Sequence, residues 1–190
     1  MRGQGPQGRM QQGMTLVELL VTLTIAAILL AIGVPAMQSF ITSNTLATSA
    51  NDLIAALNLG RAEAVRCGTN ISVTFTYGAG PAATWSVASC STAAAMRVGS
   101  FTDTQLALGG VTPVANVATF DSLGRLVGAA PGGLYGLIVC RGGALAAGGR
   151  STSRAVLVAP TGRIKIAPTD AATGAPLKAA ATDVTSCTAL

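Results

Sequence analysis

Histidine is absent from this 190-residue chain, and only seven residues are acidic. Without histidine, neither a Ser-His-Asp nor a Cys-His catalytic arrangement can form, and a zinc or haem site with a histidine ligand is also excluded. Lys165 and Lys178 are the only lysines, and neither lies in the Ser-x-x-Lys motif that some serine hydrolases use. We therefore expect a structural or binding protein, with no enzymatic activity, no cofactor and no metal.

Charge is also scarce and unevenly spread. Charged residues make up 10% of the chain, against about 25% in an average soluble domain. Residues 125–190 contain seven basic and two acidic residues, whereas residues 14–124 contain three basic and five acidic ones. A basic excess at one end indicates a polyanion or an anionic surface as partner. The alternative is a solvated basic face that keeps an apolar protein soluble.

A long apolar run follows a polar and basic N-terminus. Residues 14–34 contain a single charged residue, Glu18, and would span roughly 31 Å as a helix, about the thickness of a bilayer core. Because Arg2 and Arg9 precede the run, residues 1–13 are predicted to stay in the cytoplasm and the remainder to be exported. A cleaved secretory signal is the alternative, since the small residues at 31 and 33 would suit a signal peptidase.

Glu18 argues against a secretory signal. A carboxylate inside an apolar helix costs about 2.5–3.5 kcal/mol on insertion scales and is usually paired with another group. The nearest cation in the sequence, Arg9, is nine residues away. If the chain were cut before Met14, the new α-amino group of one subunit could neutralise Glu18 of the next in a stack of parallel helices. We therefore interpret Glu18 as an assembly residue.

The residues from Gly13 to Leu20 resemble the type IV prepilin signature. In that family a prepilin peptidase cuts after the glycine and methylates the new N-terminus, and a glutamate in the first helical turns aids filament assembly. The resemblance implies that Gly13 precedes the cut, that Met14 is the methylated residue and that Glu18 acts in assembly. Met14 departs from the phenylalanine that is commoner there, and Pro35 falls where pilins often carry a helix-bending proline.

The helix is predicted to continue past Pro35 to residue 66. It should stop at Cys67-Gly68, because glycine often follows the C-terminus of a helix. Polar residues such as Arg61 and Glu63 are expected to cover the faces of the helix outside its apolar stripe. An apolar stripe at helical spacing would pack on a globular domain, and it consists of Leu46, Ala50, Leu53, Leu57 and Ala64.

Short β-like runs separated by glycine and proline follow the helix. We predict strands at 71–77, 85–87, 117–120, 134–140, 155–159 and 163–166, and loops at the Gly/Ala/Thr-rich segments 78–83, 142–149 and 171–181. Gly124 and Gly162 are each predicted to adopt a positive φ in a hairpin turn. The pattern therefore predicts an α+β fold, in which a long N-terminal helix with a membrane half and an amphipathic half packs on a small antiparallel β-sheet domain. The resemblance to prepilins implies that this fold is type IV pilin-like.

Four cysteines, Cys67, Cys90, Cys140 and Cys187, lie far apart in the sequence. No C-x-x-C motif is present, so a zinc or thioredoxin-like site is not indicated. An exported domain lies in an oxidising compartment, where disulfides persist. Three pairings are possible, and we favour Cys67–Cys90 with Cys140–Cys187 because neighbours in sequence meet easily in a meander.

Three motifs stand out in the body of the chain: N-L-G-R-A-E-A-V-R at 58–66, F-D-x-x-G-R at 120–125 and R-A-V-x-x-x-x-T-G-R at 154–163. In these motifs the chain resembles the GspH/FimT family of minor pilins and pseudopilins. Members of that family belong either to type II secretion systems or to type IV pili. Some FimT-like members bind DNA during natural transformation through a Gly-Arg-x-Arg motif.

The corresponding segment here runs from Gly162 through Arg163 to Lys165, with lysine in place of the second arginine. Alternation places Arg163 and Lys165 on one face of a strand, and Arg150 and Arg154 are expected to join that face. The resemblance and the charge asymmetry together predict salt-sensitive, sequence-independent binding of double-stranded DNA. The alternative is a GspH-like pseudopilin that acts in protein export without binding DNA.

These predictions divide the chain into four parts: a cleaved leader at 1–13, a transmembrane and assembly helix at 14–36, an amphipathic continuation at 37–66, and an exported β-rich head at 67–190. The expected location is the inner membrane, crossed once, with the head in the periplasm and the chain incorporated in a pilus or pseudopilus. The expected partners are other pilins or pseudopilins, the prepilin peptidase and the inner membrane.

Overall fold

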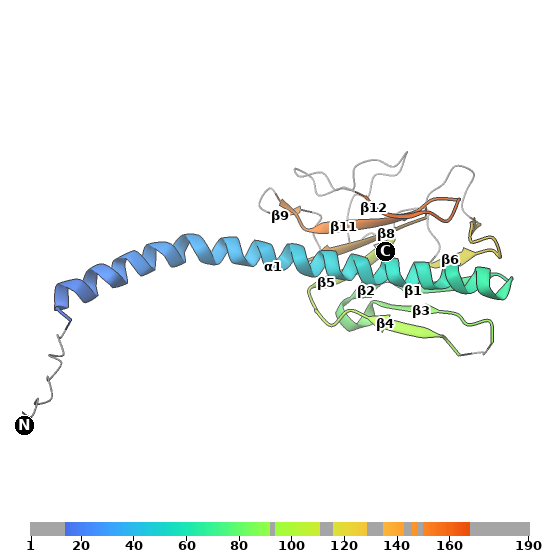
Figure 1. The fold of residues 1–190 in the computed structure, drawn as a ribbon, viewed down its shortest axis with the longest axis horizontal. Helices are drawn as coiled ribbons and strands as arrows, with labels where there is room; N and C mark the ends of the chain where they lie inside the picture. The colour runs from blue at the N-terminus through green and yellow to red at the C-terminus, as the bar shows by residue number, and fades with distance from the viewer. Residues whose placement is uncertain are drawn as a thin grey trace, which may run out of the picture. The chain divides into compact units, whose positions relative to one another are not determined.

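A computed structural model describes residues 14–91, 94–110, 116–128, 135–142, 146–147 and 150–167. The chain divides into two compact units, Met1–Phe40 and Ile41–Leu190. Helix α1, Leu16–Cys67, contributes to both units (Figure 1). The remaining elements belong to the second unit: strands β1 Ile71–Thr76, β2 Gly78–Ala79, β3 Thr84–Val87, β4 Arg97–Ser100, β5 Leu106–Gly110, β6 Val117–Phe120, β7 Leu126–Val127, β8 Tyr135–Arg141, β9 Ala146–Ala147, β10 Arg150–Ser151, β11 Ser153–Val158 and β12 Ile164–Ala167, with a 3-10 helix at Gly80–Ala82.

In the first unit, α1 begins with a capping arrangement. Thr15 precedes the helix, and its Oγ1 accepts a hydrogen bond of 3.2 Å from the backbone N–H of Glu18. A threonine followed three residues later by glutamate is a common helix start, because both side chains can accept from orphan N–H groups and the carboxylate favours the positive end of the helix dipole. Pro35 lies inside α1 and does not end it, as predicted.

The segment of α1 in the first unit is apolar and exposed. An 18-residue window reaches a mean hydropathy of 2.5 and has no buried residue, so by length and composition the helix could cross a membrane. Leu16, Leu23 and Ile32 expose 61–81% of their surface. A face of this kind is uncommon on a soluble monomer, and it is the expected surface for a segment that lies in lipid or among other helices.

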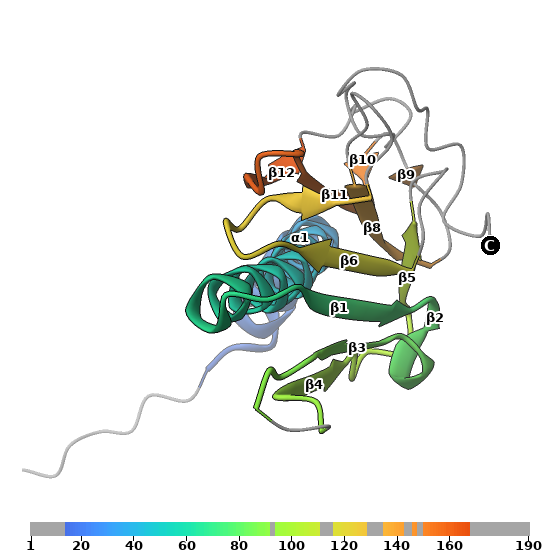
Figure 2. The same ribbon diagram turned by 90° about the vertical axis from the view of Figure 1, so that its right-hand side faces the viewer.

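Two antiparallel five-stranded sheets and a short β9–β10 pair build the second unit. The strand orders are β4-β3-β1-β6-β7 and β12-β11-β8-β5-β2, and the strands of both sheets curve around the second half of α1 (Figure 2). The predicted apolar stripe is confirmed: Leu46, Ala50, Leu53, Leu57 and Ala64 are each fully buried. They meet Phe75 and Phe120, which are also fully buried, in the core between the helix and the sheets.

The structure adds strands that the sequence pattern missed. β4 and β5 pair with β3 and β8, and part of the segment 78–83, predicted as a loop, forms β2 and the 3-10 helix. β9 lies within the predicted loop 142–149, and the third predicted loop, 171–181, is outside the described residues. These strands are rich in glycine, alanine and serine, which favour strands weakly, so their pairing depends on neighbouring strands.

α1 ends where the sequence predicted. Its last residue is Cys67, and Gly68 follows with φ of +65°. Glycine adopts this left-handed conformation without a steric penalty from Cβ, which explains why the helix stops there.

Candidate functional sites

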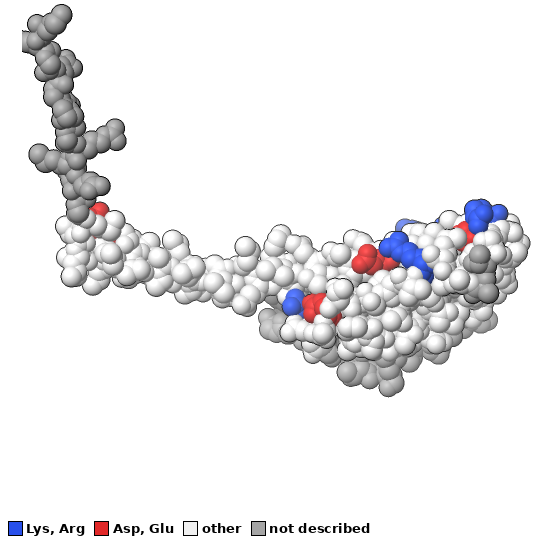
Figure 3. Space-filling view, turned by 90° about the horizontal axis from the view of Figure 1, so that it is seen from below, with Lys and Arg blue, Asp and Glu red and all other residues white. Residues whose placement is uncertain are grey.

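The predicted assembly residues lie at the start of α1. Gly13 is outside the described residues, whereas Met14 and Glu18 are described and exposed. Glu18 is the only charged residue between positions 14 and 51, and the first part of the helix carries one acidic group and is otherwise uncharged (Figure 3). Within the described residues Glu18 has no ion-pair partner. Its negative charge is therefore available to a group on another molecule.

The predicted basic face is smaller in the structure than expected. Arg163 and Lys165 are exposed, and neither forms an ion pair within the described part of the chain. Lys165 lies opposite Leu157 in the β11–β12 register, so it shares a face of the sheet with residues 153, 155 and 157.

Arg154 does not belong to that face, so this part of the prediction is wrong. It alternates with Leu157 and lies opposite Val139, on the side of the sheet that packs toward α1. Its Nη2 donates to Ser43 Oγ at 3.3 Å and its Nη1 to the Ser153 carbonyl at 2.9 Å. The β11–β12 register is the reason: Lys165 lies opposite Leu157, and Arg154 is three positions from Leu157 in the same strand, so it lies on the other face. Arg150 lies in β10, and the placement of its side chain is outside the described features.

The two Gly-Arg turns stack on each other. Gly124 and Gly162 have φ of +73° and +77°, which confirms both predicted turns. The two turns have the same bonds: Gly124 N–H donates to Asp121 and Gly162 N–H to Ala159, both at 2.8 Å. Leu126 N–H donates to the Pro160 carbonyl at 3.0 Å, which joins the edge of one sheet to the turn of the other.

Arg61 holds this stack from the helix. Its Nε donates to the Gly124 carbonyl at 2.9 Å, and a Cβ on Gly162 would lie 3.0 Å from the same Nε. Arg61 was predicted only to cover a face outside the apolar stripe, and in the structure its hydrogen-bond partner is 63 residues away in the chain. Because the Gly162 turn is held in this stack, the stack also sets the position of the next residue, Arg163.

Glu63 belongs to a second cluster of polar side chains in the head, at the end of α1. It was predicted on a face outside the apolar stripe, and in the structure it is nevertheless buried, with 4% of its surface exposed. Arg66 donates to both of its oxygens, from Nε at 2.8 Å and from Nη2 at 2.6 Å. These hydrogen bonds hold the pKa of the Glu63 carboxyl below its ordinary value, and they outweigh the opposing effect of burial.

The Glu63–Arg66 pair is next to a disulfide. Cys67 and Cys90 are bonded, with Cα atoms 6.2 Å apart, and Cys90 Sγ lies 3.4 Å from a Glu63 oxygen. This confirms one predicted pairing. Cys140 is also disulfide-bonded, and its predicted partner, Cys187, is outside the described residues. Glu63, Cys67 and Cys90 are close enough together to hold a metal ion, but sulfurs joined in a disulfide are not thiolate ligands.

Comparison with known families shows to which family the chain belongs. Residues 8–34 match the prokaryotic N-terminal methylation motif. Residues 49–162 match the type II transport protein GspH family. The chain belongs to the GspH family. No curated protein matches it.

Among solved structures, the chain is similar to the Pseudomonas aeruginosa type IV minor pilin FimU. One crystal form shares 26% sequence identity, with a TM-score of 0.52, over 68% of this chain and 92% of that one. A second crystal form shares 27% identity over 65% of this chain and 93% of that one, with a TM-score of 0.49. The family and the fold together support a minor pilin or pseudopilin, that is, a structural subunit.

The GspH match covers most of the head features described above. It begins in the second half of α1 and includes Arg61, Glu63 and the Cys67–Cys90 disulfide, and it ends at Gly162. Arg163 and Lys165 therefore lie just beyond it. The burial of Glu63 could have been predicted from helical spacing, because it is three residues from Gly60 on the buried side of the helix. Its ion pair could also have been predicted, because Arg66 follows at the i+3 position.

Proposed function

We propose that this chain is a minor pilin or pseudopilin. Residues 1–13 form a leader that prepilin peptidase removes, residues 14–36 hold the protein in the inner membrane and then in a filament, and residues 67–190 form a periplasmic head. One observation carries the proposal: Glu18 has no ion-pair partner within the described residues, and it is the only charged residue of the exposed apolar segment 16–34, within the matched methylation motif. Family membership and the FimU likeness support it.

Glu18 has a defined chemical role in this proposal. Cleavage before Met14 creates an α-amino group, and an amine that is methylated once still carries a positive charge. In a parallel stack the amine of one subunit can pair with Glu18 of its neighbour, in a low-dielectric surrounding where an unpaired charge is costly. The pair therefore favours one axial register between neighbouring helices.

The test compares Glu18→Ala with Thr24→Ala in the organism that makes the filament. Thr24 lies in the same apolar segment, and its hydroxyl donates only to the Leu20 carbonyl at 2.8 Å. We expect Glu18→Ala to reduce the amount of protein in sheared filaments or membrane cross-links at least about tenfold, since leaving one charge of a buried pair unpaired costs several kcal/mol. The mass of the processed, methylated N-terminus is measured in parallel. Equal incorporation of both variants would contradict the assembly role.

A second candidate is binding of double-stranded DNA by Arg163 and Lys165, as in a DNA-uptake pilin. Its support is that both cations are exposed and unpaired within the described residues. The alternative is a pseudopilin of a type II secretion system that exports protein without binding DNA. Because Arg154 lies on the other face, Arg163 and Lys165 are the cations of this segment with described side chains, and they supply about two phosphate contacts.

A gel-shift titration of the full chain in detergent distinguishes these candidates. Two phosphate contacts predict that log affinity falls with log salt concentration with a slope near −2. Arg163→Ala/Lys165→Ala should abolish that salt-dependent binding, whereas Arg97→Ala, which removes an exposed cation from β4, should leave it unchanged. If the double variant and the parent bind alike, DNA is not a ligand of this segment.

A further inference from the structure

The end of α1 brings a buried ion pair and a disulfide into direct contact. Glu63 is 4% exposed, whereas the side chain of its partner Arg66 is 62% exposed. The same Arg66 Nη2 that donates to Glu63 Oε1 lies 3.5 Å from Cys90 Sγ. Glu63 Oε1 in turn lies 3.4 Å from that sulfur. One positive and one negative group therefore contact a single sulfur atom of the disulfide.

The two cysteines of the bond differ in access. Cys90 is exposed and lies in the chain that links β3 to β4. Cys67 is only partly exposed and is the last residue of α1. A reagent from solution therefore reaches the Cys90 sulfur more readily, and this is the sulfur that the charged pair contacts.

The charged pair has two opposing effects on Cys90 when the disulfide is open. A cysteine reacts with a disulfide as the thiolate, which a neighbouring cation stabilises. Arg66 is such a cation. The carboxylate of Glu63 acts in the opposite sense, because it places a like charge beside the thiolate. The balance between the two side chains therefore determines how readily Cys90 becomes a nucleophile.

We propose that Cys90 is the sulfur through which this bond is made, by exchange with an external disulfide, and that the Glu63–Arg66 pair sets its reactivity. The Cys90 thiolate attacks one sulfur of the external disulfide, whose S–S bond breaks and releases one thiolate. The Cys67 thiolate then attacks Cys90 Sγ, the Cys67–Cys90 bond forms, and the second external thiolate leaves. The two thiol protons pass to the departing thiolates, and two electrons pass from the chain to the oxidant.

This chemistry gives the head a place in a reaction sequence. A thiol–disulfide exchange reaction, of the kind found in oxidising compartments, must act on Cys90 before the end of α1 is joined to the chain between β3 and β4. Cys67 completes the bond only when the helix end already lies beside that chain. The inference needs neither a filament nor DNA, so it is independent of the proposed function.

The first experiment identifies the reacting sulfur in the full chain in detergent, with a metal chelator present. Cys67→Ser leaves Cys90 as a thiol, Cys90→Ser leaves Cys67, and the bond at Cys140 remains in both. Each variant is mixed with oxidised glutathione, and the mixed disulfide is located by peptide mass mapping. We expect Cys90 to react at least about tenfold faster than Cys67. Trp85 fluorescence checks that both variants are folded.

The parent chain provides the same test without a substitution. It is treated briefly with reduced glutathione, and the sulfur that is released is trapped with N-ethylmaleimide. We expect glutathione on Cys90 and maleimide on Cys67. The reverse arrangement, or equal amounts of both, would overturn the choice of Cys90.

Charge variants in the Cys67→Ser background test the ion pair. Glu63→Gln removes the negative charge and still accepts from Arg66, so the pH midpoint for alkylation of Cys90 by iodoacetamide should fall by about half to one unit. Adding Arg66→Gln removes the cation without leaving a buried acid unpaired, and it should raise the midpoint again by a similar amount. A purely structural role would shift the midpoint in the same direction at both steps, because each substitution would loosen the same contacts.

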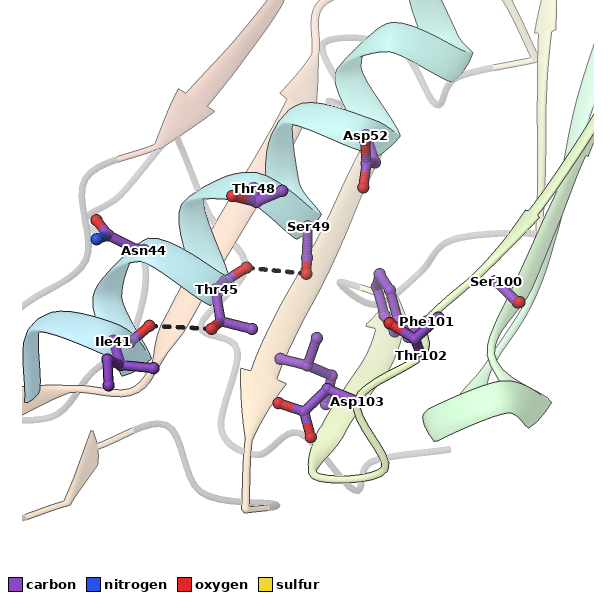
Figure 4. Close-up of a pocket in the computed structure, with 11 residues that line it drawn as sticks. Ile41, Asn44, Thr45, Thr48, Ser49, Asp52, Ser100, Phe101, Thr102 and Asp103 are labelled. Carbon is purple, nitrogen blue, oxygen red and sulfur yellow. Dashed lines mark hydrogen bonds between the residues drawn. The ribbon is translucent and has the colours of Figure 1, made fainter. Parts of the chain in front are cut away.

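Two control variants match the charges that are removed. Arg125→Gln removes an arginine whose side chain is 61% exposed and which also pairs with an acid nearby in the chain. Asp52→Asn removes an acid of α1 that lies eleven residues before Glu63. Asp52 lines a groove together with Asp103, which belongs to the loop between β4 and β5 (Figure 4). Both controls should leave the alkylation midpoint of Cys90 unchanged.

Each outcome decides the proposal. Opposite shifts in the two steps, with unchanged controls, support the role of the ion pair. Shifts in one direction, no shifts, or equal shifts in the controls would overturn it. Because these measurements use the isolated chain, their failure leaves the filament function and the test of DNA binding untouched.

Discussion

Glu63 is a charged residue whose buried position could not be inferred from its polarity. It is a carboxylate on the buried side of a helix, and it remains charged because Arg66 donates to both of its oxygens. A buried acid of this kind is tolerable only with its partner, since a lone charge would be strongly destabilising. The pair therefore links the last turn of α1 to the disulfide beside it.

Stability should fall in acid partly through Glu63. Hydrogen bonds from Arg66 lower its pKa in the fold from an ordinary value of 4.5. Its contribution is therefore present above that ordinary value and is lost as the pH falls through the lower folded pKa. Denaturant unfolding followed by fluorescence of Trp85, the single tryptophan, should show a smaller drop from pH 7 to pH 3 in Glu63→Gln than in the parent. Asp52→Asn, which removes an exposed acid without an ion pair among the described residues, serves as the control. An identical acid response of Glu63→Gln and the parent would contradict the assignment.

At the scale of elements, the two stacked turns fasten one sheet to the other. Each turn is a local structure that its glycine permits, but their contact is close: a Cβ on Gly162 would overlap the Gly124 carbonyl oxygen. The contact is the reason that glycine is needed twice over at position 162, for its positive φ and for its lack of a side chain.

Gly162→Ala and Gly128→Ala form a matched pair that separates these two requirements. Their φ values are +77° and +78°, so each alanine carries a similar backbone cost of about 1–2 kcal/mol. Nothing lies within 4 Å of a Cβ at Gly128, whereas the site at Gly162 is filled. We expect Gly162→Ala to be less stable than Gly128→Ala by a further 1–3 kcal/mol or so, measured by thermal or denaturant unfolding. Equal losses would show that the turns separate without cost.

For the whole molecule, the Cys67–Cys90 disulfide connects the end of α1 to the chain that links β3 and β4. The bond spans 23 residues, and the helix end it holds carries the Glu63–Arg66 pair. It therefore stabilises the junction between the helix and the sheet rather than either element alone.

Removing this bond as Cys67→Ser/Cys90→Ser should lower the unfolding free energy by about 3 kcal/mol, the value expected for a loop of this length. The double variant is preferable to chemical reduction, which would also break the bond at Cys140. The measurement is again Trp85 fluorescence in denaturant, with the full chain in detergent. A loss below about 0.5 kcal/mol would mean that the junction is held by packing alone.

The features that were predicted correctly from the sequence depend on local chemistry. The apolar run, the helical stripe, the glycine stop after Cys67 and the two hairpin glycines each depend on residues within a few positions of one another. Their spacing or their backbone preference is visible in the chain itself. The prepilin-like start could also be recognised from the sequence, because Gly13, Glu18 and the apolar run occur at a fixed and short spacing.

Long-range packing decided the rest, because its partners are far apart in the chain. The strand register places Arg154 on the side of the sheet that faces the helix, whereas Arg163 and Lys165 lie on the other side. A shift of one position would exchange the two faces of a strand. Burial of Glu63, the hold of Arg61 on Gly124 and the groove at Asp52 and Asp103 all arise where the helix meets strands or loops distant in sequence. The sequence alone thus determined the long apolar helix and the class of fold, whereas the surfaces of the head were determined by which strands pair and which side of α1 they cover.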